Sequence, residues 1–269
     1  MTSPSSSPKR SLDRFFGVFS MKSPVTSPTA TVFLREFKAY FATPLAAVFL
    51  VVFLALGAAM TFFLSGFFQR GSADLAGFFV WMPWLMLILL PALGMRLWAE
   101  ERRTGMIELL MTLPVTTTQL VVGKFLAGWA FAAVALLLTL PLWLTVNWLG
   151  SPDNGVILAG YFGSLLMAAA FLAVSAAVSA LTKNQVIAFI GAALLCFVLI
   201  SAGLDLVLGL LRDWAPQGVT RLIQSFSVLQ HFTRFTSGIL EVTGVIFFVS
   251  LTVVALFVNV LLLDLKKAQ

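Results

Sequence analysis

The sequence contains few charged residues, and this shortage excludes most classes of soluble protein. Only 10% of its 269 residues are charged, whereas 60% are hydrophobic. In a soluble domain about a quarter of all residues are charged, and polar side chains are needed to cover the surface. A soluble enzyme and a disordered chain are therefore excluded, and the single cysteine, Cys196, excludes a scaffold of intrachain disulfides. Lipid must surround most of this chain.

Long uncharged runs separate the clusters of charge, and each run has room for one membrane span. A helix needs about 20 apolar residues to cross the hydrocarbon core. The runs lack the alternating pattern of a barrel wall, so helices are expected instead of strands. The sequence therefore predicts an all-α integral membrane protein with six transmembrane helices, near residues 44–67, 77–98, 122–148, 156–181, 186–208 and 241–264.

The basic residues predict the orientation of these spans. An even number of spans places both termini on one side of the membrane. Most of the 17 Lys and Arg residues fall in the termini and loops of that side. The positive-inside rule then predicts cytoplasmic N- and C-termini. The net charge of +6 is explained by this topology and by contact with anionic membrane lipids, so nucleic acid is not an expected partner.

The first 43 residues predict a tail followed by a helix on the membrane surface. Residues 1–30 are rich in Ser and Pro and predict a disordered cytoplasmic tail. Over 31–43, helical spacing separates an aromatic face from a charged face, as in an interfacial amphipathic helix. The segment could instead be the cytosolic end of a long first span, but Pro44 favours a separate helix. The residues expected to define this helix are Phe33, Phe37 and Phe41 on one face and Arg35, Glu36 and Lys38 on the other.

The loop between the second and third spans, 99–118, carries the most informative pattern. Four consecutive charged residues precede Thr104-Gly105, where we expect a break and then a short helix with Thr104 as its N-cap. That helix would present an apolar stripe to the cytoplasm. We expect the stripe to pack against lipid, against its own bundle or in a groove of a cytosolic partner. The predicted docking residues are Glu100, Glu101, Arg102, Arg103, Thr104, Gly105, Met106, Glu108, Leu109, Leu110, Leu113 and Pro114.

The spacing within this loop resembles that of a known family. The pattern consists of Glu101, Gly105, Glu108, Leu110 and Pro114, followed by Gly123-Lys124. It resembles the loop signature of ABC-2 permeases, which are the membrane subunits of ATP-binding-cassette exporters. The closest resemblance is to the branch that includes gliding-motility permeases. The helix at 35–41, the segment 227–238 and the basic end of the chain also fit, so the resemblance covers residues 32–267. Met106 stands where the family usually has Thr, and Glu241 where it often has Asp.

The resemblance implies a fold, partners and a site. It implies a six-helix permease of the bacterial inner membrane, paired with a second copy or a paralogue and bound to two copies of a separate cytosolic ABC ATPase. It implies short outer-leaflet helices within an extracytoplasmic segment, 209–238, and leaves room for an extracytoplasmic accessory subunit. The loop 99–118 would be the coupling helix seated on the ATPase, and export would be the direction of transport.

The chain has no phosphate-binding loop of its own. The pattern Gly-x-x-x-x-Gly-Lys-Ser/Thr does not occur in it. We therefore expect ATP and Mg²⁺ to bind to the partner ATPase and no cofactor to bind to this chain. The protein is predicted to be a transport subunit and not an enzyme.

Two residues inside the predicted spans are the polar candidates for a role at membrane depth. Lys124 lies one turn inside span three and is expected to extend towards the inner lipid headgroups. Asp205 lies near the outer end of span five. Its two alternative roles are an ion pair with Arg212 and a relay for substrate or protons. Trp98 is expected at headgroup depth. The small residues of span four predict a central helix.

Two other classes of protein remain as alternatives. A membrane-embedded enzyme would need a group of titratable residues at membrane depth, whereas Lys124 and Asp205 are isolated. A secondary transporter or channel would need paired broken helices or a charged lining in two related halves, and the sequence lacks that pattern. The only histidine, His231, belongs to no metal-binding pattern and is expected to cap a helix.

Overall fold

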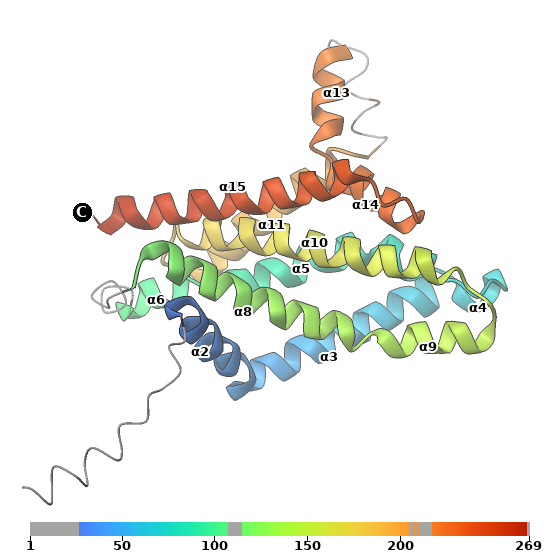
Figure 1. Cartoon of the computed structure of the whole chain (residues 1–269), viewed down its shortest axis with the longest axis horizontal. Helices are drawn as coiled ribbons and strands as arrows, with labels where there is room; N and C mark the ends of the chain where they lie inside the picture. The colour runs from blue at the N-terminus through green and yellow to red at the C-terminus, as the bar shows by residue number, and fades with distance from the viewer. Residues whose placement is uncertain (1–26, 107–114, 205–206, 208, 210–216, 268–269) are drawn as a thin grey trace, which may run out of the picture.

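The computed structural model describes residues 27–106, 115–204, 207, 209 and 217–267, and these residues contain helices and no strand. The long helices run roughly side by side (Figure 1). They are α3 (Pro44–Ala59), α5 (Ala76–Gly94), α8 (Thr117–Leu137), α9 (Leu140–Leu149), α10 (Asn154–Ser179), α11 (Gln185–Ser201) and α15 (Val242–Lys267). The other elements are α2 (Pro28–Ala42), the π-helical turn η1 (Met60–Leu64), α4 (Phe67–Arg70), α6 (Ala99–Thr104), α13 (Gln217–Ser225) and α14 (Val228–Thr236).

The bundle has two distinct ends. The helix α6 and the carboxyl end of α15 lie at one end, with α2 beside them, and we call this the α6 end (Figure 1). The short helix α4 lies at the opposite end, together with the carboxyl end of α9. The described part of the predicted docking loop, 99–106 and 115–118, therefore lies at the α6 end, as does the end of α15.

Five helices of the described part are long and apolar enough to cross a membrane: Ala46–Arg70, Ala76–Thr104, Thr117–Leu149, Asn154–Ser179 and Val242–Leu265. They correspond to predicted spans one to four and six, so the all-α membrane fold is confirmed. Predicted span five is too long, because α11 ends at Ser201 and has 17 residues. The chain turns at Gly203. A Cβ atom on Gly203 would lie 1.9 Å from Oγ of Ser227, the N-cap of α14, so the start of α14 lies directly against this turn. Asp205 lies outside the described residues.

The small residues of α10 place it at the centre of the bundle, as predicted. It packs against α5, α8, α11, α14 and α15. A Cβ atom on Gly94 of α5 would lie only 2.4 Å from Ser175 Cβ. A Cβ atom on Gly160 would lie 2.6 Å from the Phe79 ring. Such close approach of helices requires small residues at the contact.

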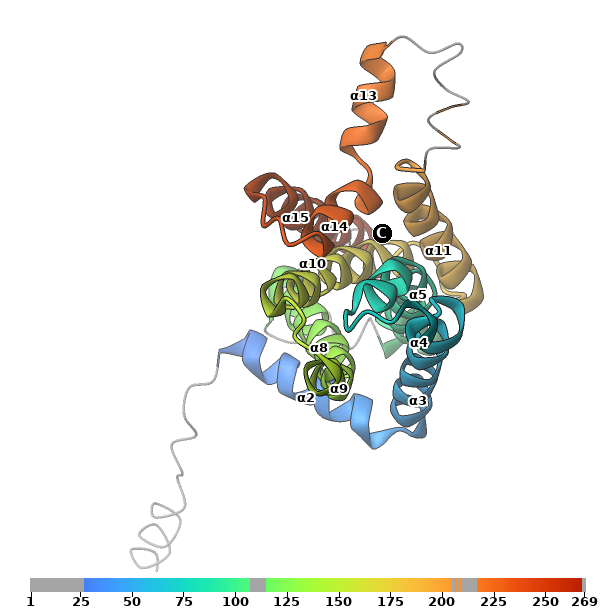
Figure 2. The same ribbon diagram turned by 90° about the vertical axis from the view of Figure 1, so that its right-hand side faces the viewer.

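The helix α2 begins earlier than the sequence indicates. Ser27 Oγ accepts a hydrogen bond from the Ala30 N–H at 3.3 Å, and Pro28 fits the first turn because that position needs no helical N–H donor. Residues 28–30, predicted as the end of a tail, are therefore helical, whereas 1–26 lie outside the described residues. The helix passes across the outside of α8 and leads into the start of α3 (Figure 2). Its contact with α8 is close, since a Cβ atom on Gly123 would lie 2.8 Å from Val32 Cγ1.

Two short amphipathic helices follow α11. In α14, Phe232 and Phe235 are buried against the bundle. In contrast, α13 projects away from the bundle, across the direction of the long helices (Figures 1 and 2). The N-cap of α14 is Ser227, whose Oγ accepts from the Gln230 N–H at 3.1 Å. His231 Nε2 lies 3.1 Å from the carbonyl oxygen of Ser225, the last residue of α13, so His231 caps the end of that helix, in agreement with the prediction.

Candidate functional site

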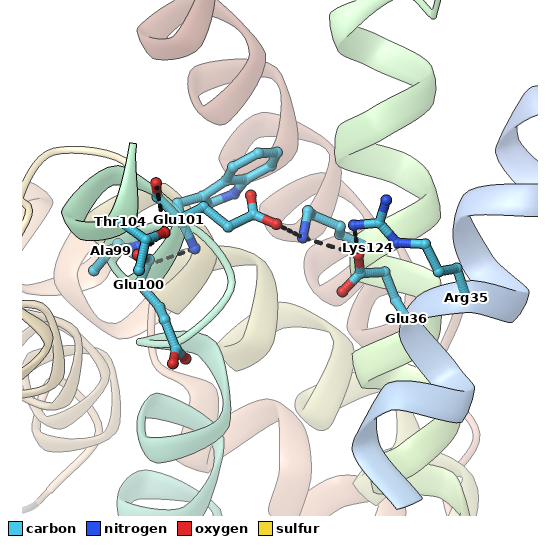
Figure 3. Close-up of polar contacts among 9 residues, drawn as sticks. Arg35, Glu36, Ala99, Glu100, Glu101, Thr104 and Lys124 are labelled. Carbon is cyan, nitrogen blue, oxygen red and sulfur yellow. Dashed lines mark hydrogen bonds and ion pairs between the residues drawn. The ribbon is translucent and has the colours of Figure 1, made fainter. Parts of the chain in front are cut away.

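A buried lysine joins three elements at the α6 end. Lys124 of α8 lies 2.6 Å from Glu101 Oε1 of α6 and 3.2 Å from Glu36 Oε1 of α2. The two carboxylates approach the ammonium from opposite sides (Figure 3). Only 3% of the Lys124 side chain is exposed, compared with 15% of Glu101 and 16% of Glu36. The prediction that Lys124 extends to lipid headgroups is wrong, because its face of α8 is turned towards α2 and α6.

Other charges and rings complete this cluster. The ring of Trp98, the residue before α6, has its centroid 5.4 Å from Lys124 Nζ, within range of a cation–π interaction. Arg35 shares Glu36 Oε1 at 3.2 Å. Glu101 Oε2 is buried and has no hydrogen-bond partner among the described residues. Trp98 is itself buried, so its ring packs against protein, and its depth in the membrane stays a prediction.

A second set of contacts ties α6 to the end of α10. Ser179 Oγ accepts hydrogen bonds from the Trp98 and Ala99 N–H groups at 3.2 and 3.0 Å, and it donates to the Met95 carbonyl at 2.8 Å. Arg102 Nη1 donates to the Ala180 carbonyl at 2.6 Å. The first N–H groups of a helix have no acceptor within that helix. Ser179 Oγ of α10 provides the acceptor for the N–H groups at the start of α6. The two ends of α6 are therefore bonded to the central helix.

The chain breaks at Gly105, as the sequence predicts. Thr104 is the last residue of α6, and its hydroxyl donates to the Glu100 carbonyl at 3.0 Å. The helix that Thr104 is expected to cap lies outside the described residues, so this role stays a prediction. Gly105 has a φ of 75°, a left-handed conformation that favours glycine, and a Cβ atom there would meet nothing within 4 Å. Met106 follows and is 53% exposed.

The remaining docking residues lie outside the described residues. They are Glu108, Leu109, Leu110, Leu113 and Pro114 within 107–114. Of the described ones, Glu100 pairs with Arg96 at 3.2 Å, and Arg103 is exposed. The structure thus brings Glu101 and Arg102 into the bundle and leaves Arg103 and Met106 on the surface.

The aromatic residues of α2 form a row that partly contacts α8. Phe33 and Phe37 have ring centroids 5.7 Å apart, and Phe37 and Phe41 have centroids 5.2 Å apart. The Phe41 ring also lies 5.6 Å from the buried Phe131 ring of α8. Lys38 is exposed, as expected, whereas Glu36 turns inward to Lys124. The location of α2 in a membrane interface stays a prediction.

An open cavity of about 380 Å³ lies beside the cluster, between α2 and α6. Burial raises the pKa of the Tyr40 hydroxyl in its wall, and the Glu36 carboxylate adds to the rise. The Tyr40 hydroxyl is therefore neutral at physiological pH. Among the described residues that line this cavity are the basic residues Arg35, Arg96 and Lys124 and the acidic residues Glu36, Glu100 and Glu101.

Sequence reasoning misses the roles of three residues of this site. In the sequence, Ser179 is one of several small residues in its helix. Trp98 and Arg96 indicate only where a span ends. No spacing pattern in the sequence links 95–99 to 179–180, because the contact joins two helices that are distant along the chain. The one available signal is the position of Lys124 within an apolar run, which favours a functional role for a charge.

The comparison with protein families gives the class of this chain. The family described as ABC-2 family transporter protein matches residues 69–262, more than half of the chain. The chain therefore belongs to the ABC-2 transporter family, and it is a multi-pass membrane protein. A comparison with curated proteins finds no match. The resemblance to the gliding-motility branch stays a prediction.

Proposed function

We propose that this chain is the permease subunit of an ABC exporter, driven by a separate cytosolic ATPase that binds at the α6 end. The observation that carries the proposal is the double attachment of α6, to α10 through Ser179 and Arg102 and to α8 through Lys124. A helix held on both sides transmits an applied displacement to the helices that hold it. Membership of the ABC-2 family supports the same assignment.

The attachment of α6 suggests how ATP binding would reach the transport pathway. When ATP closes two ATPase subunits, the surface that grips α6 and the residues after Gly105 moves. Because α10 packs against five other helices, a shift of α6 would bias one of two packings of the bundle. The chain's own residues thus carry the displacement, while the ATPase binds ATP and Mg²⁺.

The proposed assembly is the one that the family implies. It contains two copies of this permease, or this chain and a paralogue, with two ATPase subunits on the cytoplasmic side of a bacterial inner membrane. An extracytoplasmic accessory subunit fits the opposite side. In this assembly the chain is a transport subunit that performs no catalysis and binds no cofactor.

The proposal can be tested by purifying the tagged chain with the ATPase encoded beside its gene. The complex is expected to hydrolyse ATP in a vanadate-sensitive manner. We expect Gly105→Pro and Glu101→Arg to lower the recovery of ATPase or its stimulation at least several-fold, because they alter the break after α6 and the contact with Lys124. Wild-type recovery and stimulation in both variants would contradict docking at this site.

A matched control exists for the glycine. Gly71, at the opposite end of the bundle, also has a positive φ, 63°, and a Cβ atom there would likewise meet nothing within 4 Å. Gly71→Pro therefore creates a similar backbone strain. It is expected to leave ATPase recovery unchanged. An equal loss in Gly71→Pro and Gly105→Pro would indicate general destabilisation of the bundle.

A further inference from the structure

We propose that Glu36, Lys124 and Glu101 form a releasable clasp, in which Glu36 keeps Lys124 paired when α6 moves away from α8. The inference rests on the proposed function, because it supplies the local event by which α6 is displaced. Lys124 and Glu36 act as positioning residues in this scheme. They set the cost of moving α6 and do not contact a substrate.

The contacts divide the α6 end into two parts. Lys124 and Glu36 belong to α8 and α2, which pack closely where Val32 meets Gly123. Glu101 belongs to α6, which is bonded to α10 through Ser179 and Arg102. Glu101 joins α6 to the first part through its ion pair with Lys124, which the Trp98 ring supports.

A second carboxylate changes the cost of separating the parts. Removing the only partner of a buried charge is strongly unfavourable, because an unpaired ion remains in a medium of low dielectric constant. Here Glu36 Oε1 already lies 3.2 Å from Lys124 Nζ. If Glu101 withdraws, the Lys124 ammonium stays paired with the Glu36 carboxylate, and neither side chain has to move far. The release of α6 therefore leaves no unpaired cation.

The surroundings of Glu101 also favour a reversible contact. Its Oε2 atom is buried without a hydrogen-bond partner among the residues that the structure describes, which costs free energy in the closed arrangement. The open cavity beside Glu101 gives water access as soon as α6 moves. Hydration of the released carboxylate would offset part of the lost ion pair, so the free-energy cost of releasing α6 would be lower than that of the ion pair alone.

The clasp predicts opposite effects of the same chemical change on its two carboxylates. Glu101→Gln weakens the contact that release breaks, so the open arrangement should become more populated. Glu36→Gln removes the partner that remains after release, so the open arrangement should become less populated. A merely structural cluster would loosen in both variants. Each change replaces one oxygen by an amide nitrogen and preserves the size of the side chain.

The experiment measures the distance between α6 and α8 in the full chain reconstituted in lipid vesicles. Spin labels are attached to Arg103→Cys and Thr118→Cys, both at exposed positions, in a Cys196→Ala background. Pulsed electron spin resonance then gives the populations of short and long distances. We expect Glu101→Gln to raise the ratio of long to short distances on the order of tenfold, the scale of one charge-assisted hydrogen bond. Adding Glu36→Gln should reverse most of that rise.

Two results would overturn the clasp. One is an unchanged distance distribution in Glu101→Gln. The other is a longer distance in the double variant than in Glu101→Gln alone, since that is the additive loosening of a structural cluster. Glu100→Gln is the matched control, because this neighbouring carboxylate pairs with Arg96 and not with Lys124. It is expected to leave the distance unchanged.

The test separates the clasp from the proposed function. The distances are measured on the chain without an ATPase, so a reversal by Glu36→Gln supports the clasp even if no ATPase binds. A complex with vanadate-sensitive ATP hydrolysis but without the reversal would support the proposed function and reject the clasp.

Discussion

Lys124 shows how one residue can carry a charge inside a bundle that lipid surrounds. Its ammonium lies between two carboxylates and under an indole ring, with 3% of the side chain exposed. Taking such ions out of water is costly, so a buried ion pair is poor evidence of stability. Breaking it by removing one partner is nevertheless strongly destabilising, whereas removing all of its charges is often nearly neutral. This asymmetry is measurable for the present cluster.

Lys124→Met should therefore destabilise the protein more than a triple variant that also carries Glu36→Gln and Glu101→Gln. The single change leaves two carboxylates buried near each other, and we expect a loss of about 3–5 kcal/mol in the free energy of unfolding. The triple variant removes those charges and should recover most of the loss. Thermal unfolding in detergent provides the measurement, with Lys183→Met at an exposed position as control. A triple variant as unstable as Lys124→Met would contradict this account.

At the scale of elements, the joint between α6 and α10 depends on a side chain that no local pattern marks. Ser179 bonds to three main-chain groups at 95–99, and Arg102 bonds to Ala180 from the other side. A short helix such as α6 has little intrinsic stability. Its position is therefore set by these contacts with α10 and by the ion pair with α8.

Ser179→Ala is expected to weaken this joint. The change leaves the buried N–H groups of Trp98 and Ala99 without their acceptor, which should cost about 1–3 kcal/mol. Ser164→Ala is the control, because Ser164 is also fully buried in α10 but donates only to the Gly160 carbonyl of its own helix, at 2.8 Å. Hydrogen exchange of the 95–106 segment should increase in Ser179→Ala and not in Ser164→Ala. Equal exchange in both variants would indicate that Ser179 does not hold α6.

The sequence predicts the spans better than it predicts their contacts. Charges exclude a segment from the hydrocarbon core, so the uncharged runs locate five long helices. The end of α11 and the partners of Lys124 depend on which helices pack together, and no local pattern of residues identifies those pairs of helices. Glu36 illustrates the limit. Helical spacing correctly separates Glu36 from the aromatic face of α2, but it does not predict that Glu36 turns towards Lys124 of α8.

At the scale of the whole molecule, the two ends of the bundle differ in charge as well as in shape. The α6 end contains Arg35, Arg96, Arg102 and Arg103, in addition to the buried Lys124. Basic residues near the ends of spans are retained in the cytoplasm. The α6 end is therefore expected to face the cytoplasm, which is also where an ATPase would find ATP.

Labelling of single cysteines can test this orientation. In a Cys196→Ala background, Ser151→Cys between α9 and α10 and Lys183→Cys between α10 and α11 place thiols at exposed positions at opposite ends of α10. A membrane-impermeant maleimide added to the side opposite the cytoplasm should react with Ser151→Cys only. Both cysteines should react after permeabilisation. Preferential reaction of Lys183→Cys from that side would reverse the topology.

The shortness of α11 has a consequence for the surrounding lipid. At 1.5 Å per residue, its 17 residues extend about 26 Å, whereas the hydrocarbon core of a typical bilayer is about 30 Å thick. The 26 residues of α15 extend about 39 Å and can satisfy the same thickness by tilting. Hydrophobic mismatch at α11 should thin the adjacent leaflets, so acyl chains of reduced length will collect along that flank of the protein.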